Sequence, residues 1–207
     1  LGAGAAALLI FAVGFRLFPR FLTTTPPRWL VYVVLPAGAV GPVLVTAGLA
    51  GGPLLHAGGA LEAIAVVGFA LAYAVLFVRS DRRRVGFYGV LAAVGAGVLG
   101  VGLGLQFAFA GREPLLVVAH YRLNLLGFLG LTIVGATMQF YPPSVGDVPG
   151  ANDTVASLAI MFLAAGLGLQ LFGVVTPNLA TFGVLCALLG ALLHAYLVFG
   201  AFLARPT

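Results

Sequence analysis

Long apolar runs, separated by short breaks, form the pattern of this chain. Most runs approach the ~20 residues that a helix needs to cross the ~30 Å hydrocarbon core of a bilayer. The breaks are rich in Thr, Pro, Gly and Asn, which end helices. We therefore predict seven transmembrane helices, over residues 1–18, 29–49, 60–78, 85–110, 115–141, 155–175 and 179–203.

The pattern predicts an all-α fold, a polytopic transmembrane helix bundle in a single domain (residues 1–207). Because the loops are short, consecutive helices should be antiparallel neighbours. A transmembrane β-barrel is excluded, since its strands would alternate apolar and polar residues over ~10-residue segments. The first run is short and begins at Leu1 instead of Met, so we expect that a segment upstream is missing.

Composition agrees with a membrane location. Of the 207 residues, 62% are hydrophobic and 7% are charged, whereas a soluble domain carries about 25% charged residues. A soluble enzyme, a nucleic-acid-binding domain and a disordered chain are therefore excluded, and membrane lipids are the expected partners. The one cysteine, Cys186, cannot form a disulfide framework or a cysteine metal cluster. The absence of lysine excludes a retinal protein, whose cofactor needs a lysine Schiff base.

The arginines indicate the orientation of the chain. With seven crossings, most of them fall on one side: Arg16, Arg20, Arg28, Arg79, Arg82, Arg83, Arg84 and Arg205. Only Arg112 lies in a loop on the other side. Under the positive-inside rule the arginine-rich loops are cytoplasmic and Leu1 is outside. The loop 142–154 is also cytoplasmic in this scheme, although it carries Asp147 and Asp153 instead of arginine. Arginine without lysine is typical of a GC-rich prokaryote, so we predict a multi-pass protein of a prokaryotic cell membrane.

Glycines and prolines lie inside the predicted helices. The fourth helix contains a Gly-xxx-Gly step at Gly100 and Gly104. Small residues let helix backbones approach closely in lipid, so this step favours tight packing; a flat cofactor or a dimer contact are the alternatives. Pro36 and Pro42 should kink the second helix, as at a transporter site or in an ordinary membrane helix.

The fifth helix is the richest in polar groups. At 100° per residue, Asn124, Gly127, Gly135 and Met138 lie within about 60° of His120. Arg122 lies on the opposite side of the helix. Polar groups in a bilayer are costly and are therefore candidates for function, although a helix histidine is more often an interhelical hydrogen-bonding group than a ligand.

Other polar candidates lie near the outer side. His56 is predicted in the outer loop after the second helix, and Glu62 at the start of the third. These two residues could converge with His120 and Arg122 in an outer polar cluster. His194 is predicted roughly 22 Å below the outer boundary and His120 roughly 7 Å below it. The two histidines are therefore not expected to bind one iron.

The fifth helix resembles a helix of the heme-copper oxidase catalytic subunits and of the related NnrS-like membrane proteins. The likeness covers residues 120–143: His120 precedes Asn124, a Leu-Gly-Phe step and Gly135, and the helix ends in Tyr141 followed by Pro142 and Pro143. Many relatives have a second histidine at the position of Arg122.

The resemblance implies a heme-binding subunit in respiratory or nitric-oxide-related redox chemistry. His120 would be the heme or metal ligand, with His56 or a group from a partner as the second ligand. Asn124 and Gly127 would give the macrocycle room, and Arg122 would pair with a heme propionate. Copper is the other cofactor that the resemblance allows.

Three histidines are fewer than a complete heme-copper centre needs, so we do not expect the chain to be a complete oxidoreductase by itself. Two alternatives remain open. One is a cofactor-free structural or accessory subunit, packed in a larger membrane complex or a homo-oligomer. The other is a small-molecule transporter, with the kinked second helix and the outer cluster lining its path.

Overall fold

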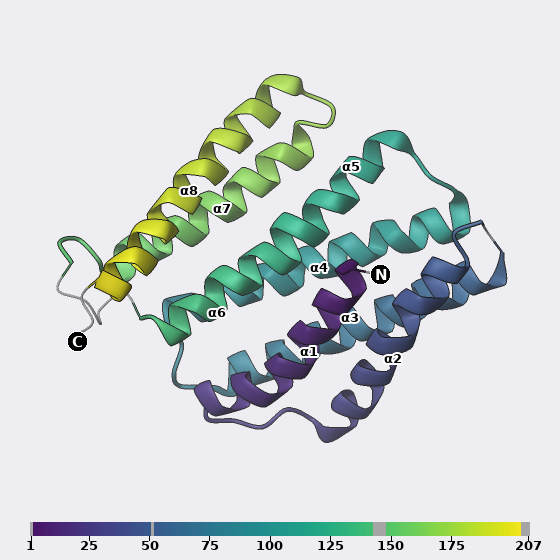
Figure 1. Cartoon of the computed structure of the whole chain (residues 1–207), viewed down its shortest axis with the longest axis horizontal. Coiled ribbons are helices and arrows are strands. Elements are labelled where there is room, and N and C mark those ends of the chain that lie inside the picture. Colours follow the sequence, from purple (N-terminus) through teal and green to yellow (C-terminus); the bar gives the residue numbers. More distant parts are fainter. Residues whose placement is uncertain (1, 51, 143–147, 204–207) are drawn as a thin grey trace. The chain divides into compact units, whose positions relative to one another are not determined.

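The computed structural model describes residues 2–50, 52–142 and 148–203, with side chains described from Gly4 onward (Figure 1). Leu1, Pro143, Asp147 and Arg205, which enter the sequence predictions, lie outside the described residues. Within these ranges the regular structure is helical and contains no strand. Its elements are α1 (Gly2–Phe21), α2 (Arg28–Ala47), α3 (Pro53–Arg79), α4 (Val85–Ala110), α5 (Pro114–Arg122), η1 (Leu123–Leu131), α6 (Thr132–Phe140), α7 (Asp153–Phe172) and α8 (Pro177–Leu203).

The prediction of an all-helical membrane protein is confirmed. Seven helical runs in the described residues are long and apolar enough to cross a membrane, the fifth being the continuous run of α5, η1 and α6. Several helix ends follow from local chemistry. Asn152, for example, begins α7 as an N-cap, because its side-chain oxygen accepts a hydrogen bond from the Val155 amide at 3.0 Å.

The predicted start of the third helix is wrong. Helix α3 begins at Pro53, seven residues before the predicted Ala60. Proline breaks a helix interior, but it suits the first helical position, where its missing N–H would be unpaired anyway. Gly52 precedes it with a φ of 96°, which glycine adopts without steric cost. His56 therefore lies in a helix and not in a loop, and Glu62 lies well inside α3.

The middle of the fifth crossing is a π-helix. The nine residues of η1 follow α5 without a break and lead directly into α6. A π-helix has i→i+5 hydrogen bonds and therefore turns less per residue than an α-helix. The sequence prediction assumed an α-helical turn of about 100° per residue, which is wrong from Leu123 onward. His120, Gly135 and Met138 therefore cannot be assigned to one helix face from their spacing.

The described residues group into two compact units. Unit 1 contains α1, α2, α3, the part of α4 from Val94 onward, α5 and η1 as far as Leu129. Unit 2 contains the first part of α4 to Ala93, the end of η1, α6, α7 and α8. Both α4 and the fifth crossing therefore pass from one unit into the other.

Aromatic side chains form the core of unit 1. Phe11 and Phe18 of α1 pack against Phe69 and Tyr73 of α3, with ring centroids 5.1 Å apart for Phe11–Phe69 and for Phe18–Tyr73. Phe128 of η1 reaches the same core, 6.0 Å from Phe11. These contacts fix η1 and, with it, the end of α5 in the unit.

Glycines set the helix contacts within each unit. In unit 1, a Cβ on Gly58 of α3 would lie 2.4 Å from the backbone nitrogen of Val45 in α2. In unit 2, a Cβ on Gly190 of α8 would lie 2.8 Å from the backbone oxygen of Ala159 in α7. Such close approach is the usual role of small residues between helices in lipid.

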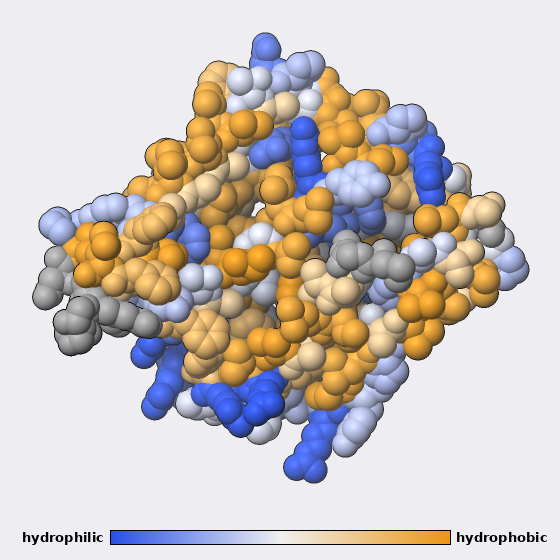
Figure 2. All heavy atoms as spheres, viewed as in Figure 1, coloured by the Kyte–Doolittle hydropathy of each residue, from blue (hydrophilic) through white to orange (hydrophobic). Residues whose placement is uncertain are grey.

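Apolar side chains predominate on the face drawn in Figure 2. Many large ones are exposed, among them Leu9, Leu99, Phe172, Phe182, Leu192 and Phe199. A soluble protein seldom exposes so much contiguous apolar surface. This exposure agrees with helices that face lipid.

Candidate functional site around His120

His120 lies in the last turn of α5, and its ring is fixed against α4. The ring nitrogen Nδ1 is 2.9 Å from the backbone oxygen of Gly100. A carbonyl oxygen only accepts, so this bond assigns the proton to Nδ1. The other nitrogen, Nε2, then carries the lone pair of the neutral ring.

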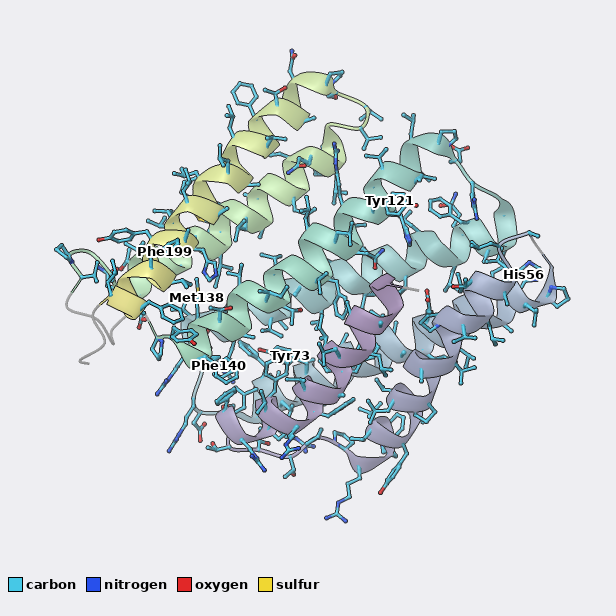
Figure 3. All side chains as sticks on the ribbon, in the orientation of Figure 1. His56, Tyr73, Tyr121, Met138, Phe140 and Phe199 are labelled. Carbon is cyan, nitrogen blue, oxygen red and sulfur yellow. The ribbon has the colours of Figure 1, made fainter. Side chains whose placement is uncertain are left out.

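Nε2 of His120 has no hydrogen-bond partner among the described residues. It is not among their fully buried unpartnered atoms, and the residue as a whole is half-buried. The rings of Phe107 and Tyr121 flank the imidazole edge-on, at centroid distances of 5.5 and 6.0 Å. Tyr121 is labelled in Figure 3. Histidines that bind metals usually donate their other N–H to a carboxylate, a carbonyl or water, and His120 shows this arrangement.

Asn124 supports the backbone at His120. Its Nδ2 donates to the backbone oxygen of His120 at 2.8 Å. Nδ2 also lies 3.3 Å from Nδ1 of His120, but with the proton on Nδ1 both atoms are donors and this contact is not a hydrogen bond. The amide of Leu123 points at the oxygens of both Ala119 and His120. Asn124 thus adds a donor where α-helical bonding gives way to π-helical bonding.

The Gly-xxx-Gly step of α4 receives these two side chains. A Cβ on Gly100 would lie 2.8 Å from Nδ2 of Asn124, and a Cβ on Gly104 would lie 3.2 Å from Cε1 of His120. The packing interpretation of the step is therefore confirmed. The space beside Asn124 at Gly100 is filled by Asn124 itself, so a flat cofactor would have to lie on the Nε2 side of His120.

The remaining residues predicted on the fifth helix do not meet His120 directly. Arg122 ends α5, is half-buried and lies about 200° around the helix from His120. Gly127 is buried inside η1. Of the predicted set on this helix, the structure brings together only His120 and Asn124.

His56 lies at a different level of α4. It sits in the first turn of α3, labelled in Figure 3, and stacks on Phe109 with a centroid distance of 4.7 Å and an interplanar angle of 13°. Phe109 is five positions beyond Gly104, the residue of α4 that faces Cε1 of His120, which is about 7.5 Å along a helix that rises 1.5 Å per residue. No contact among the described residues joins His56 to His120.

Glu62 faces α2. A Cβ on Gly41 of α2 would lie 2.9 Å from Cγ of Glu62, which is half-buried. No contact among the described residues joins Glu62, His56 and His120. The same part of the chain has no group of three or more His, Cys, Asp and Glu side chains that could hold a metal ion.

Two buried nitrogens in unit 2 were not predicted. Within the described ranges, Nε2 of Gln139 in α6 and Nδ1 of His194 in α8 are buried without a hydrogen-bond partner. Gln139 packs against Gly86, where a Cβ would lie 2.4 Å from its Nε2. The sequence places Gly86 and Gln139 far apart, and no motif links them.

Comparison with family models, with curated proteins and with solved structures gave no match to this chain.

Proposed function

We propose that the chain is a membrane subunit that binds heme through Nε2 of His120 and takes part in respiratory or nitric-oxide-related redox chemistry. One observation carries this proposal: the Nδ1–H of His120 is held by the Gly100 oxygen at 2.9 Å, while Nε2 makes no hydrogen bond among the described residues. The resemblance of residues 120–143 to a heme-copper oxidase helix is its second support.

His120 is the residue that would hold the heme iron. Neutral imidazole is a common ligand of heme iron, and donating the second N–H to a carbonyl fixes the ring and raises its basicity. No contact among the described residues joins His56 to His120; the His56 ring stacks on Phe109 instead. A partner subunit or a small molecule would therefore supply any second ligand. When bound, the heme would supply one-electron transfer or diatomic-gas binding.

The neighbouring residues orient this ligand. Asn124 holds the backbone oxygen of His120, and the edges of Phe107 and Tyr121 limit rotation of its ring. Arg122 lies on the other side of α5, so a propionate contact from Arg122 is not part of the proposal.

A visible spectrum with a heme count tests the proposal. The chain is purified in detergent from heme-replete cells, and the oxidised and dithionite-reduced spectra are recorded for wild type, His120→Ala, His56→Ala and His194→Ala. We expect about one heme per chain and a Soret band that shifts on reduction. Only His120→Ala should lose it. A colourless wild type, or His120→Ala with a full heme complement, would refute heme binding by His120.

A second function is favoured by the packing at Gly100 and Gly104. If His120 serves only to join α5 to α4, the chain is a cofactor-free accessory subunit of a larger complex. The wild type would then be colourless, and His120→Ala would lower stability without any spectral change. The same set of variants distinguishes the two proposals.

A further inference from the structure

The two ends of unit 1 differ in charge. Exposed arginines gather where α1 ends, α2 begins and α3 ends: Arg16, Arg20, Arg28, Arg79, Arg82 and Arg83. Among the described residues at this end, the only acidic one is Asp81. At the opposite end, where α4 ends and α5 begins, Arg112 and Glu113 balance each other. Hydrophilic side chains gather along the lower edge of Figure 2, where Figure 1 places the end of α1 and the start of α2.

The side chain of Arg83, unlike those of Arg79 and Arg82, is bound to backbone carbonyls. Its Nε donates to the backbone oxygens of Phe77 and Ser80, each at 3.2 Å, and its Nη2 donates to that of Val78 at 2.9 Å. The guanidinium also lies 5.2 Å from the centre of the Phe77 ring. Arg83 thus satisfies carbonyls left open at the end of α3.

The turn after α3 is fixed by a hydrogen bond to Ser80, and the side chains of Arg79 and Arg82 remain exposed. Ser80 is buried, and its hydroxyl accepts a hydrogen bond from the Arg82 amide at 3.0 Å. The side chains of Arg79 and Arg82 are exposed. Among the described interactions, neither guanidinium makes a hydrogen bond or an ion pair.

Aromatic residues place this end at the membrane surface. Trp29 and Tyr32 follow Arg28 at the start of α2 and are 62% and 77% exposed. Trp and Tyr gather at headgroup level in membrane proteins. The arginines beside them are therefore within reach of lipid headgroups.

We propose that this arginine-rich end of unit 1 binds the phosphate headgroups of anionic phospholipids. Guanidinium groups pair with phosphate oxygens through two parallel hydrogen bonds. Clustered arginines at a membrane surface attract anionic lipid, and each contributes to the attraction.

Lipid-dependent thermal stability tests this proposal. The purified chain is reconstituted in nanodiscs of phosphatidylcholine alone or of phosphatidylcholine mixed with phosphatidylglycerol, and Tm is measured in each. We expect a higher Tm with phosphatidylglycerol. The double variant Arg79→Gln/Arg82→Gln removes two of the six arginines, so it should lose about one-third of that difference if each contributes equally.

Matched variants make the result specific. Arg112→Gln, at the other end, should keep the full lipid-dependent difference. Arg83→Gln should lower Tm in both lipids, because it releases the carbonyls at the end of α3, and should lower the difference between them less than the double variant does. If the 79/82 variant fails to fold, Arg16→Gln/Arg20→Gln replaces it with the same expected loss.

Three results would overturn the proposal: equal wild-type Tm values in the two lipids, an undiminished difference in the double variants, or the same stabilisation by soluble glycerol phosphate. Stabilisation by glycerol phosphate would show that the arginines bind a free anion. Equal Tm values in the two lipids would instead point to an acidic protein as the partner.

Discussion

His120 of unit 1 and His194 of unit 2 are both half-buried histidines in apolar helices, yet their surroundings differ. Nδ1 of His120 is bonded to the Gly100 oxygen, whereas Nδ1 of His194 is buried without a partner. A buried polar atom that lacks a hydrogen bond costs free energy. Position in an apolar helix is thus shared by the two histidines, and the partner of Nδ1 is what distinguishes them.

The side-chain amides of Asn124 and Gln139 show the same contrast between a bonded and an unbonded nitrogen. Asn124 and Gln139 each pack against a glycine of α4, Gly100 and Gly86 respectively. Asn124 donates to the His120 oxygen, whereas Nε2 of Gln139 has no partner. Glycine provides room in both places, but only unit 1 also provides a partner.

The largest expected effect on the free energy of unfolding comes from adding a side chain at the glycines of α4 that face these amides. In Gly86→Ala the new Cβ would lie 2.4 Å from the backbone oxygen of Gly135, which cannot move without the helix. We expect a loss of about 3 kcal/mol in the free energy of unfolding. Gly100→Ala meets only the Asn124 side chain, at 2.8 Å, and should cost about 1 kcal/mol.

Gly102→Ala is the control, because nothing lies within 4 Å of its Cβ. Chemical unfolding in detergent measures all three. A Gly86→Ala protein as stable as Gly102→Ala would contradict the close contact between α4 and α6.

His120→Leu and His194→Leu should change the free energy of unfolding in opposite directions. His194→Leu removes a buried unpartnered nitrogen and should stabilise the chain by about 1 kcal/mol. His120→Leu loses the bond to Gly100 and should destabilise it by about 1 kcal/mol. Unfolding of heme-free protein measures both, and a shift in the same direction for the two variants would remove the contrast between them.

The amide pair should give the smallest effects. Asn124→Leu loses one hydrogen bond at the start of η1 and should cost about 0.5–1 kcal/mol. Gln139→Leu should be neutral or slightly stabilising. Hydrogen exchange adds a local readout, because the amides of η1 should exchange faster in Asn124→Leu and keep their wild-type rate in Gln139→Leu.

The hydrophobic runs predicted the seven crossings well, because a bilayer demands long apolar helices wherever the chain crosses it. The error at α3 arose from Pro53, whose effect depends on whether it stands inside a helix or begins one. That error placed His56 in a loop. Composition gave no sign of η1, whose residues are as apolar as those of the neighbouring α4.

The sequence also predicted part of the candidate site. His120 and Asn124 were expected on one face, and they do meet, because their spacing of four precedes most of the π-helix. The helical pattern alone does not separate His120 from His194, and only the resemblance of residues 120–143 favoured His120. The bond that distinguishes the two in the structure depends on Gly100, which lies twenty residues from His120 and is one of many glycines in α4.

Imidazole rescue of a His120→Gly variant tests heme ligation by His120 most directly. The variant is purified and its spectrum is recorded before and after addition of imidazole, with His194→Gly as the control. We predict that His120→Gly lacks the Soret band of the wild type, that imidazole with added heme restores it, and that His194→Gly keeps it throughout. A His120→Gly protein that retains the wild-type spectrum without imidazole would contradict the assignment.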